Sequence, residues 1–144
     1  MRNLLEKALH TNIDEVVCIS LKQDEKRRQE TLTECQKIGL PVKFHIVERH
    51  PISGVQGCLE SHLALIAYAK KRQLKNILIL EDDVTFDKEA IEQTSITLPE
   101  DWQMFYLGYH VNKGYRVKDN VMKLMSALTT HSYLLPLCLS HFSK

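Results

Sequence analysis

The sequence predicts a single α/β domain in which helices flank a mostly parallel β-sheet. The first observation behind this prediction is that short apolar, β-branched segments alternate with segments whose apolar residues have helical spacing. The second is the segment Asn76–Glu81 (NILILE), which has no polar alternation and is typical of a strand buried on both faces of a parallel sheet. A length of 144 residues suits one domain with its own core.

The first strand and the first long helix are expected before residue 41. Glu15–Leu21 (EVVCISL) is a short, β-branched apolar run, which predicts a buried strand. In residues 22–40 a charged start gives way to Leu32, Cys35 and Ile38, spaced by three, which predicts an amphipathic helix. A glycine and a proline follow, as is usual after the end of a helix.

The centre of the chain predicts a strand, a loop, a second helix and the most apolar strand. Residues 42–48 (VKFHIVE) alternate in polarity and predict a strand, whereas the proline and glycines of residues 49–57 predict a loop. Residues 58–74 predict a helix that leads into the strand Asn76–Glu81. One stripe of this helix contains Leu59, His62, Leu63, Ile66 and Ala67.

The last third of the chain has weaker patterns. Residues 87–98 predict a short helix, residues 101–109 a strand and residues 114–120 a polar loop. Residues 121–142 are ambiguous, because their segment SYLLPLCL is compatible with a strand interrupted by its proline or with the start of a helix.

Composition limits the partners that the chain can have. A net charge of +1 gives no bulk attraction to nucleic acid or to a charged membrane surface. No apolar run approaches the roughly 20 residues of a membrane-spanning helix, and the amino-terminal residues lack the long apolar core of a secretory signal.

The cysteines are widely separated and form no Cys-x-x-Cys pair, which favours a reducing, cytoplasmic location. They are Cys18, Cys35, Cys58 and Cys138.

Three consecutive acids, Glu81, Asp82 and Asp83, follow the most apolar strand. Ligands of open α/β sheets bind beyond the carboxyl ends of the strands. Carboxylates suit Mn²⁺ or Mg²⁺, which usually bind through one or two of them plus substrate phosphates. Because three adjacent like charges repel one another, we favour a metal site that bridges the phosphates of a nucleotide. The alternative is that the acids cap the next helix.

Several classes of α/β nucleotide-binding protein end a strand in acids, and glycine patterns exclude two of them. A P-loop needs Gly-x-x-x-x-Gly-Lys-Ser/Thr, but Gly54 and Gly57 are not followed by lysine. The dinucleotide-binding Gly-x-Gly-x-x-Gly is absent as well. A phosphorelay receiver would carry its acids after the first strand, whereas here they follow the third expected strand, which disfavours that class.

Two further groups of residues are candidates for binding. Lys22, Arg27 and Arg28 follow the first strand, where they could meet phosphate or carboxylate or form a solvated first helical turn. Cys58 and His62 lie four residues apart on one helical face and could supply two zinc ligands. Because the sequence shows no second pair of ligands, we expect His62 to donate hydrogen bonds or to pack instead.

Four segments resemble, in order and spacing, glycosyltransferase family 25, which includes lipooligosaccharide and collagen hydroxylysine galactosyltransferases. They are VVCISLKQDEKRRQET, GVQGCLESHLALI, ILILEDDVTF and DWQMFYLGY. The resemblance covers about residues 15–133 of a single domain, 1–144, and leaves 134–144 unassigned. The chain differs at Ser20, where the family usually has asparagine, and at residues 23–26, which replace Pro-Asp. Because family members continue further, we expect a short or C-terminally truncated member, incomplete at that end.

The resemblance implies a GT-A-like nucleotide-binding sandwich that uses Mn²⁺, or Mg²⁺, to hold a UDP-sugar. It makes Asp83 the direct metal ligand. It also implies that Asp82 and Glu81 contact the nucleotide sugar or orient metal-bound water. In such folds the metal neutralises the leaving diphosphate.

The resemblance implies nucleotide-binding roles for residues outside the acidic motif as well. Ser20 and Leu21 would line the uridine pocket through backbone groups, and Arg28 would lie near the base or the phosphates. Ser61 and His62 would support the site from the neighbouring helix. The acceptor base and the other catalytic residues are not assigned.

Three hypotheses for function follow. The preferred one is a metal-dependent glycosyltransferase that moves a hexose, galactose or glucose, from a UDP-sugar to a saccharide or a hydroxylysine-type protein acceptor. The first alternative, favoured by the short carboxyl terminus, is a catalytically silent relative that binds nucleotide-sugar or a protein partner. The second is a plain α/β scaffold whose acids cap helices.

Overall fold

The structure, a computed structural model, describes residues 2–108, 111–118, 121–127 and 132–137. The helices are α1 (Leu4–Leu9), α2 (Glu25–Lys37), α3 (Gly54–Lys71) and α4 (Lys88–Glu92). The strands are β1 (Glu15–Leu21), β2 (Lys43–Val47), β3 (Asn76–Glu81), β4 (Phe105–Gly108), β5 (Val111–Lys118), β6 (Val121–Ala127) and β7 (Ser132–Pro136). None of the helices in this described part of the chain combines the length and the apolar character needed to cross a bilayer.

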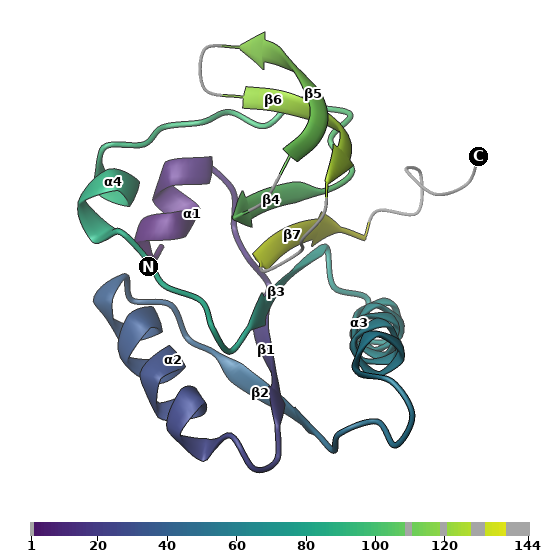
Figure 1. Ribbon diagram of the computed structural model, residues 1–144. Coiled ribbons are helices and arrows are strands. Elements are labelled where there is room, and N and C mark those ends of the chain that lie inside the picture. Colours follow the sequence, from purple (N-terminus) through teal and green to yellow (C-terminus); the bar gives the residue numbers. More distant parts are fainter. Residues whose placement is uncertain (1, 109–110, 119–120, 128–131, 138–144) are drawn as a thin grey trace.

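Five of the strands form one mixed sheet in the order β2-β1-β3-β7-β4 (Figure 1). β1 pairs in parallel with β2 and β3, whereas β7 pairs antiparallel with β3 and β4. The expectation of a mostly parallel sheet therefore holds for β2-β1-β3 and is wrong at β7. The reason is that the continuous apolar pattern of β3 reflects burial on both faces, which is the same whichever way a neighbouring strand runs.

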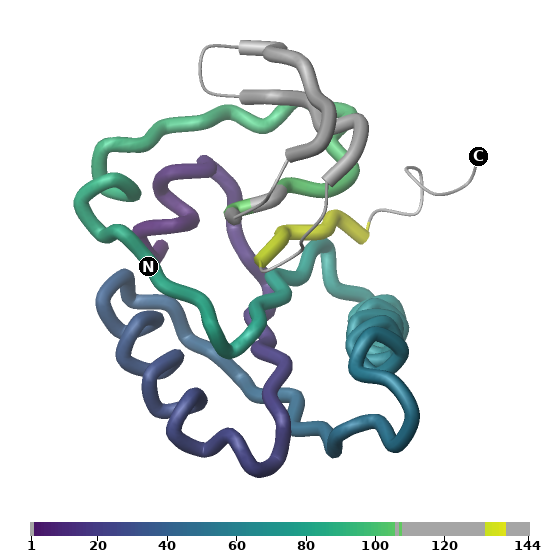
Figure 2. Tube along the Cα trace, viewed as in Figure 1, coloured from purple at the N-terminus to yellow at the C-terminus, as the bar shows by residue number. Residues whose placement is uncertain are grey.

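The two faces of the sheet carry separate cores, because side chains alternate along each strand. On one face Cys18 of β1 and Leu80 of β3 pack with Leu9 of α1 and Cys35 of α2. Figure 1 shows α1 and α2 on one side of the sheet and α3 on the other, and the trace in Figure 2 follows the same two layers around β1 and β3. The core that faces α3 contains Val17, Leu65, Ala69, Ile77 and Ile79.

Hydrogen bonds at the helix ends explain two differences from the expected elements. No helix is expected at α1, yet Asn3 accepts from the Glu6 N–H at 2.9 Å and Glu6 accepts from the Asn3 N–H at 3.1 Å, which is a capping box. α3 begins four residues earlier than expected, because Ser53 caps it by accepting from the Gln56 N–H at 3.3 Å. Residues 54–57 are therefore helical and not part of a loop.

The last third of the chain contains more strand than expected. Residues 114–118, for which a polar loop is expected, belong to β5, so that expectation is wrong. Main-chain pairing with β6 holds this strand, which therefore needs no continuous apolar run. The ambiguous residues 121–142 contain β6 and β7, and the proline of SYLLPLCL is the last residue of β7. Residues 119–120 of the expected loop, and residues 128–131 and 138–142 of the ambiguous segment, lie outside the described part of the chain.

The double-sided burial of β3 predicts the cost of shortening one of its side chains. Leu78 is 0% exposed, so Leu78→Ala should lower the free energy of unfolding by about 2–5 kcal/mol through lost apolar contact and a residual cavity. Urea denaturation followed by circular dichroism measures this difference. Leu63→Ala in α3 is the control, because Leu63 is 55% exposed and its truncation should change stability by less than about 0.5 kcal/mol. Equal losses in the two variants would contradict the assigned core.

Candidate functional site

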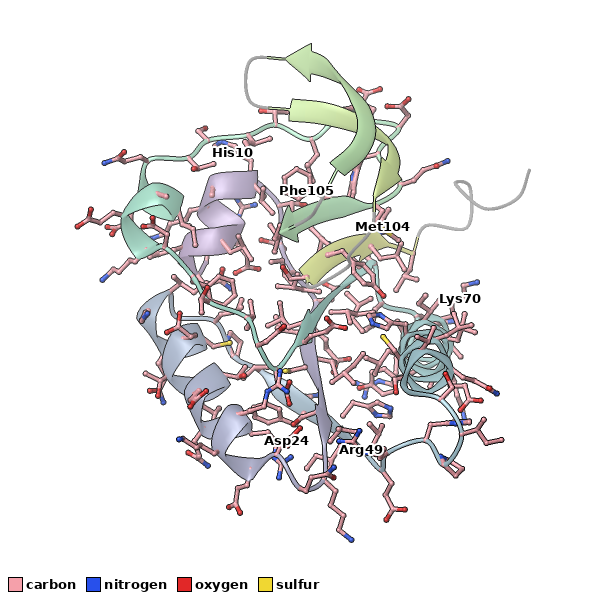
Figure 3. The ribbon with its side chains drawn as sticks, in the orientation of Figure 1. His10, Asp24, Arg49, Lys70, Met104 and Phe105 are labelled. Atoms are coloured by element: carbon pink, nitrogen blue, oxygen red, sulfur yellow. The ribbon has the colours of Figure 1, made fainter. Side chains whose placement is uncertain are left out.

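The candidate site lies where three parallel strands end. β1, β2 and β3 run in the same direction, so their carboxyl ends share one edge of the sheet. Glu81 is the last residue of β3, and Asp82 and Asp83 form the turn that follows; we call these three residues the acidic turn. Figure 3 shows Asp24, which precedes α2, and Arg49, which follows β2, at the same edge. The acids thus lie at the sheet edge expected from the sequence.

Asp82 is held by groups from β1 and α2. Its Oδ2 accepts a hydrogen bond from the Ser20 hydroxyl at 2.7 Å, and its Oδ1 pairs with Arg27 Nη2 at 2.9 Å. Asp82 is only 9% exposed, and a charged group with so little contact with water needs both an opposite charge and hydrogen bonds. Ser20 and Arg27 supply these, so the Asp82 side chain is fixed in place.

α2 also holds the main chain of the acidic turn and of the segment after it. The Thr31 hydroxyl, which donates to the Arg27 carbonyl of its own helix at 2.9 Å, also lies 3.3 Å from the Asp82 carbonyl and shares its proton between the two. Further on, the Phe86 N–H donates to Glu34 Oε1 at 2.8 Å. Lys37, 2.6 Å from the same carboxylate, and then this N–H lower the pKa of Glu34, so that it remains a charged acceptor. Contacts from α2 on both sides of residue 83 therefore fix the path of the chain.

Arg28 donates hydrogen bonds to groups at the end of β1 and just after it. Its Nη1 donates to the Leu21 carbonyl at 2.6 Å and to the Ser20 hydroxyl at 3.1 Å, and its Nη2 donates to the Lys22 carbonyl at 3.1 Å. The Asp24 N–H donates to the same Leu21 carbonyl at 3.0 Å. The Arg28 guanidinium thus brings a fixed positive charge to the edge of the sheet while its donors satisfy carbonyls at the end of β1.

Glu81 points toward α3, on the opposite face from Asp82. Glu81 Oε1 lies 3.8 Å from His62 Nε2 and 3.7 Å from Cys58 Sγ, which donates toward it. His62 Nδ1 lies 2.6 Å from the hydroxyl of Tyr133 in β7, and the two rings stack with 5.5 Å between centroids. Two adjacent carboxylates therefore have different surroundings, sulfur and imidazole for Glu81 but hydroxyl and guanidinium for Asp82.

The described cysteines differ in their capacity to react or to bind a metal. Burial, with a contribution from the Asp82 charge, raises the pKa of Cys18 to about 12, and burial raises the pKa of Cys35 to about 11. Desolvation of the sulfur and the neighbouring Glu81 carboxylate also raise the pKa of Cys58. Cys58 is nevertheless the exposed one of the three, so solvent species can reach its thiol.

The site residues expected from the sequence fall into two contact groups. The first consists of Ser20, Leu21, Arg28 and Asp82. The second brings Glu81 and His62 together. Ser61 joins neither group, because its buried hydroxyl donates to the Gly57 carbonyl of its own helix at 2.9 Å. Asp83 is exposed in the acidic turn.

Three residues make contacts in the candidate site that the sequence does not indicate. Arg27, a candidate for phosphate, pairs with Asp82. Thr31 and Tyr133 are 51 and 71 positions from the partners that they meet in the site, so no local pattern marks them. The only local sign is the position of Thr31 four residues after Arg27, which puts both on one face of α2.

The site residues lie partly within a recognised family domain. The family model for glycosyltransferase family 25 (LPS biosynthesis protein) matches residues 45–135, more than half of the chain. The match contains α3, β3 and the acidic turn, and it agrees with the resemblance seen in the sequence. No curated protein matches the chain.

The contacts of Asp82 predict a difference between two neighbouring carboxylates. Asp82→Asn should lower the free energy of unfolding by about 1–3 kcal/mol, because the buried side chain then turns an amide NH₂ donor toward a neighbour, the Ser20 hydroxyl or the Arg27 guanidinium, that itself donates to the Asp82 carboxylate. Asp83→Asn is the matched control, and its exposed side chain should cost less than about 0.5 kcal/mol. Urea denaturation at pH 7 compares the two. A loss for Asp83→Asn as large as for Asp82→Asn would contradict the assigned support.

Proposed function

The chain belongs to glycosyltransferase family 25, and on this premise we propose that it moves a hexose, galactose or glucose, from a UDP-sugar to a saccharide or hydroxylysine-type acceptor. The observation that carries the proposal is the acidic turn, which lies within the matched residues at the carboxyl edge of β1, β2 and β3. Nucleotides and their phosphates bind at this edge in open α/β sheets. We assign a GT-A-like organisation to the domain on the same grounds.

The acidic turn has the donor chemistry of a Mn²⁺ or Mg²⁺ site. Both cations prefer carboxylate oxygens and leave positions for water and phosphate. In our proposal Asp83, exposed at the edge, is the direct ligand. Asp82, whose two oxygens meet Ser20 and Arg27, fixes the turn and so orients the site. Glu81 contributes its carboxylate from the end of β3.

The residues at the end of β1 are proposed to hold the nucleotide. Ser20 and Leu21, the last residues of β1, would line the nucleotide pocket through their backbone groups. The Arg28 guanidinium, which donates to the Leu21 carbonyl, gives this edge a fixed positive charge. A positive group held in place before substrate arrives stabilises a diphosphate without further reorganisation. His62 supports the edge from α3 beside Glu81, whereas the Ser61 hydroxyl donates within α3 and supports the helix itself. When bound, the metal would neutralise charge on the leaving diphosphate.

The metal assignment predicts the behaviour of one variant. Asp83→Ala should weaken Mn²⁺-dependent UDP binding by about tenfold or more, since a ligand of the cation is lost. Isothermal titration calorimetry with UDP, with and without Mn²⁺, measures the change. Asp101→Ala is the control, because Asp101 is also an exposed acid and precedes β4, away from the acidic turn. Unchanged binding in Asp83→Ala would overturn the assignment.

A second measurement separates transfer from binding. The full 144-residue chain should hydrolyse or transfer sugar from UDP-galactose or UDP-glucose in the presence of Mn²⁺. UDP binding without turnover of any UDP-sugar would favour the catalytically silent relative. Absence of metal-dependent UDP binding would overturn the proposed function as a whole.

A further inference from the structure

A cluster of three chemically different side chains joins the start of α3 to the end of β3. Cys58 and His62 lie one helical turn apart, and Glu81 faces both of them from the strand. One ligand atom from each, a sulfur, a ring nitrogen and a carboxylate oxygen, all lie within 4.8 Å of one another. This cluster lies on the α3 face of the sheet, whereas Asp82 is held on the α2 face.

The two separations from Glu81 Oε1 to the other ligand atoms are close to those of a tetrahedral metal site. Zinc bonds of about 2.0–2.3 Å to nitrogen, oxygen and sulfur put neighbouring tetrahedral ligands about 3.4–3.6 Å apart. Glu81 Oε1 is 3.7 Å from Cys58 Sγ and 3.8 Å from His62 Nε2. Each of these two separations exceeds the tetrahedral value by only a few tenths of an ångström, and all three ligand atoms lie within 4.8 Å of one another, so small side-chain movements would bring them around one ion.

His62 has the orientation of a metal-binding histidine. Its Nδ1 lies 2.6 Å from the Tyr133 hydroxyl, and Tyr133 is itself buried. If Nδ1 carries the proton and donates it to that hydroxyl, then Nε2 presents a lone pair toward Glu81 and Cys58. Metal-bound histidines usually donate their other ring N–H in this way, which fixes the tautomer and the ring.

The other ring nitrogen of His62, Nε2, lacks a hydrogen-bond partner among the described residues. This nitrogen is buried. The Glu81 oxygen at 3.8 Å is too far for a hydrogen bond. A buried polar atom without a partner costs free energy, and a cation between these groups would remove that cost.

We propose that Cys58, His62 and Glu81 form a binding site for Zn²⁺, or for a divalent cation of similar softness. A thiolate, an imidazole and a carboxylate are a ligand set that zinc accepts and that Mg²⁺ and Mn²⁺ do not prefer. On binding, the Cys58 thiol loses its proton to solvent and its sulfur bonds to the ion. Because Cys58 is exposed, the fourth position is open to water or another small ligand.

The site shares Glu81 with the acidic turn, but its other two ligands are sulfur and nitrogen, so it differs in chemistry from the proposed Mn²⁺ site, whose direct ligand is Asp83. The inference does not depend on the proposed function. The site ties α3 directly to β3 through the ion, which two ligands from the helix and one from the strand surround. Its test therefore uses the metal alone, without nucleotide.

The experiment is a cobalt titration of the full, reduced chain. Co²⁺ should produce a thiolate-to-cobalt charge-transfer absorption and the visible bands of a tetrahedral site, and stoichiometric Zn²⁺ should remove both by displacement. Cys58→Ser should abolish the charge-transfer absorption. His62→Gln and Glu81→Gln should each weaken Co²⁺ binding by about tenfold or more.

Tyr133 is a positioning residue in this proposal. Tyr133→Phe removes the hydroxyl that meets His62 Nδ1 and should weaken Co²⁺ binding by about tenfold or more while the charge-transfer absorption from Cys58 is retained at saturating Co²⁺. A purely structural role for Tyr133 would lower thermal stability and leave the Co²⁺ affinity unchanged.

The controls separate this site from other acids and thiols. Glu60→Gln, on the exposed side of α3, and Cys138→Ser should both retain the wild-type spectrum. Asp83→Ala should retain it too, even if that variant loses Mn²⁺-dependent UDP binding, so the two proposals can fail separately. The absence of a charge-transfer absorption in the wild-type chain, or its persistence in Cys58→Ser, would overturn the inference. The wild-type result stands even if a variant does not fold, which circular dichroism reports.

Discussion

The buried carboxylate of Asp82 is the interaction on which the candidate site depends. A charge with so little contact with water is tolerable only with a counter-charge and hydrogen bonds, and α2 and β1 supply them through Arg27 and Ser20. Since Asp82 directly follows β3, its contacts fix the direction in which the chain leaves the strand. The positions of its neighbours follow, with Glu81 facing α3 and Asp83 exposed at the edge.

The two faces of the sheet consequently differ in chemistry at a single edge. On the α2 face, hydroxyl and guanidinium groups bond to main-chain carbonyls and to Asp82, so these groups act as a support. On the α3 face, sulfur, imidazole and carboxylate groups converge around a ring nitrogen that lacks a hydrogen-bond partner within the described residues. A rigid support beside a group with unused binding capacity is the usual organisation of a functional site.

The sequence predicts those features that local patterns encode. The apolar run of β3 and the acids after it locate the edge, and the family resemblance agrees with the match at residues 45–135. The direction of β7 cannot be predicted in this way, because a strand buried on both faces has the same composition beside either kind of neighbour. The Cys58–Glu81 contact spans 23 positions and joins a helix to a strand, so the pair spacing of Cys58 and His62 shows only two of the three ligands. The capping box of the short helix α1 depends on two reciprocal hydrogen bonds between Asn3 and Glu6 and is easily missed beside stronger apolar patterns.

The place of β7 in the sheet has a consequence for synthesis on the ribosome. β3 pairs with β1 on one side and with β7 on the other, where Ile79 is opposite Tyr133. A growing chain therefore releases β1, β2, β3 and the two long helices well before the strand that completes the centre of the sheet. During that interval β3 presents unpaired main-chain groups and apolar side chains, the state in which nascent chains associate with one another. Pairing between such distant segments is also slow compared with local helix formation. The chain should therefore be most prone to self-association in the interval before β7 pairs with β3.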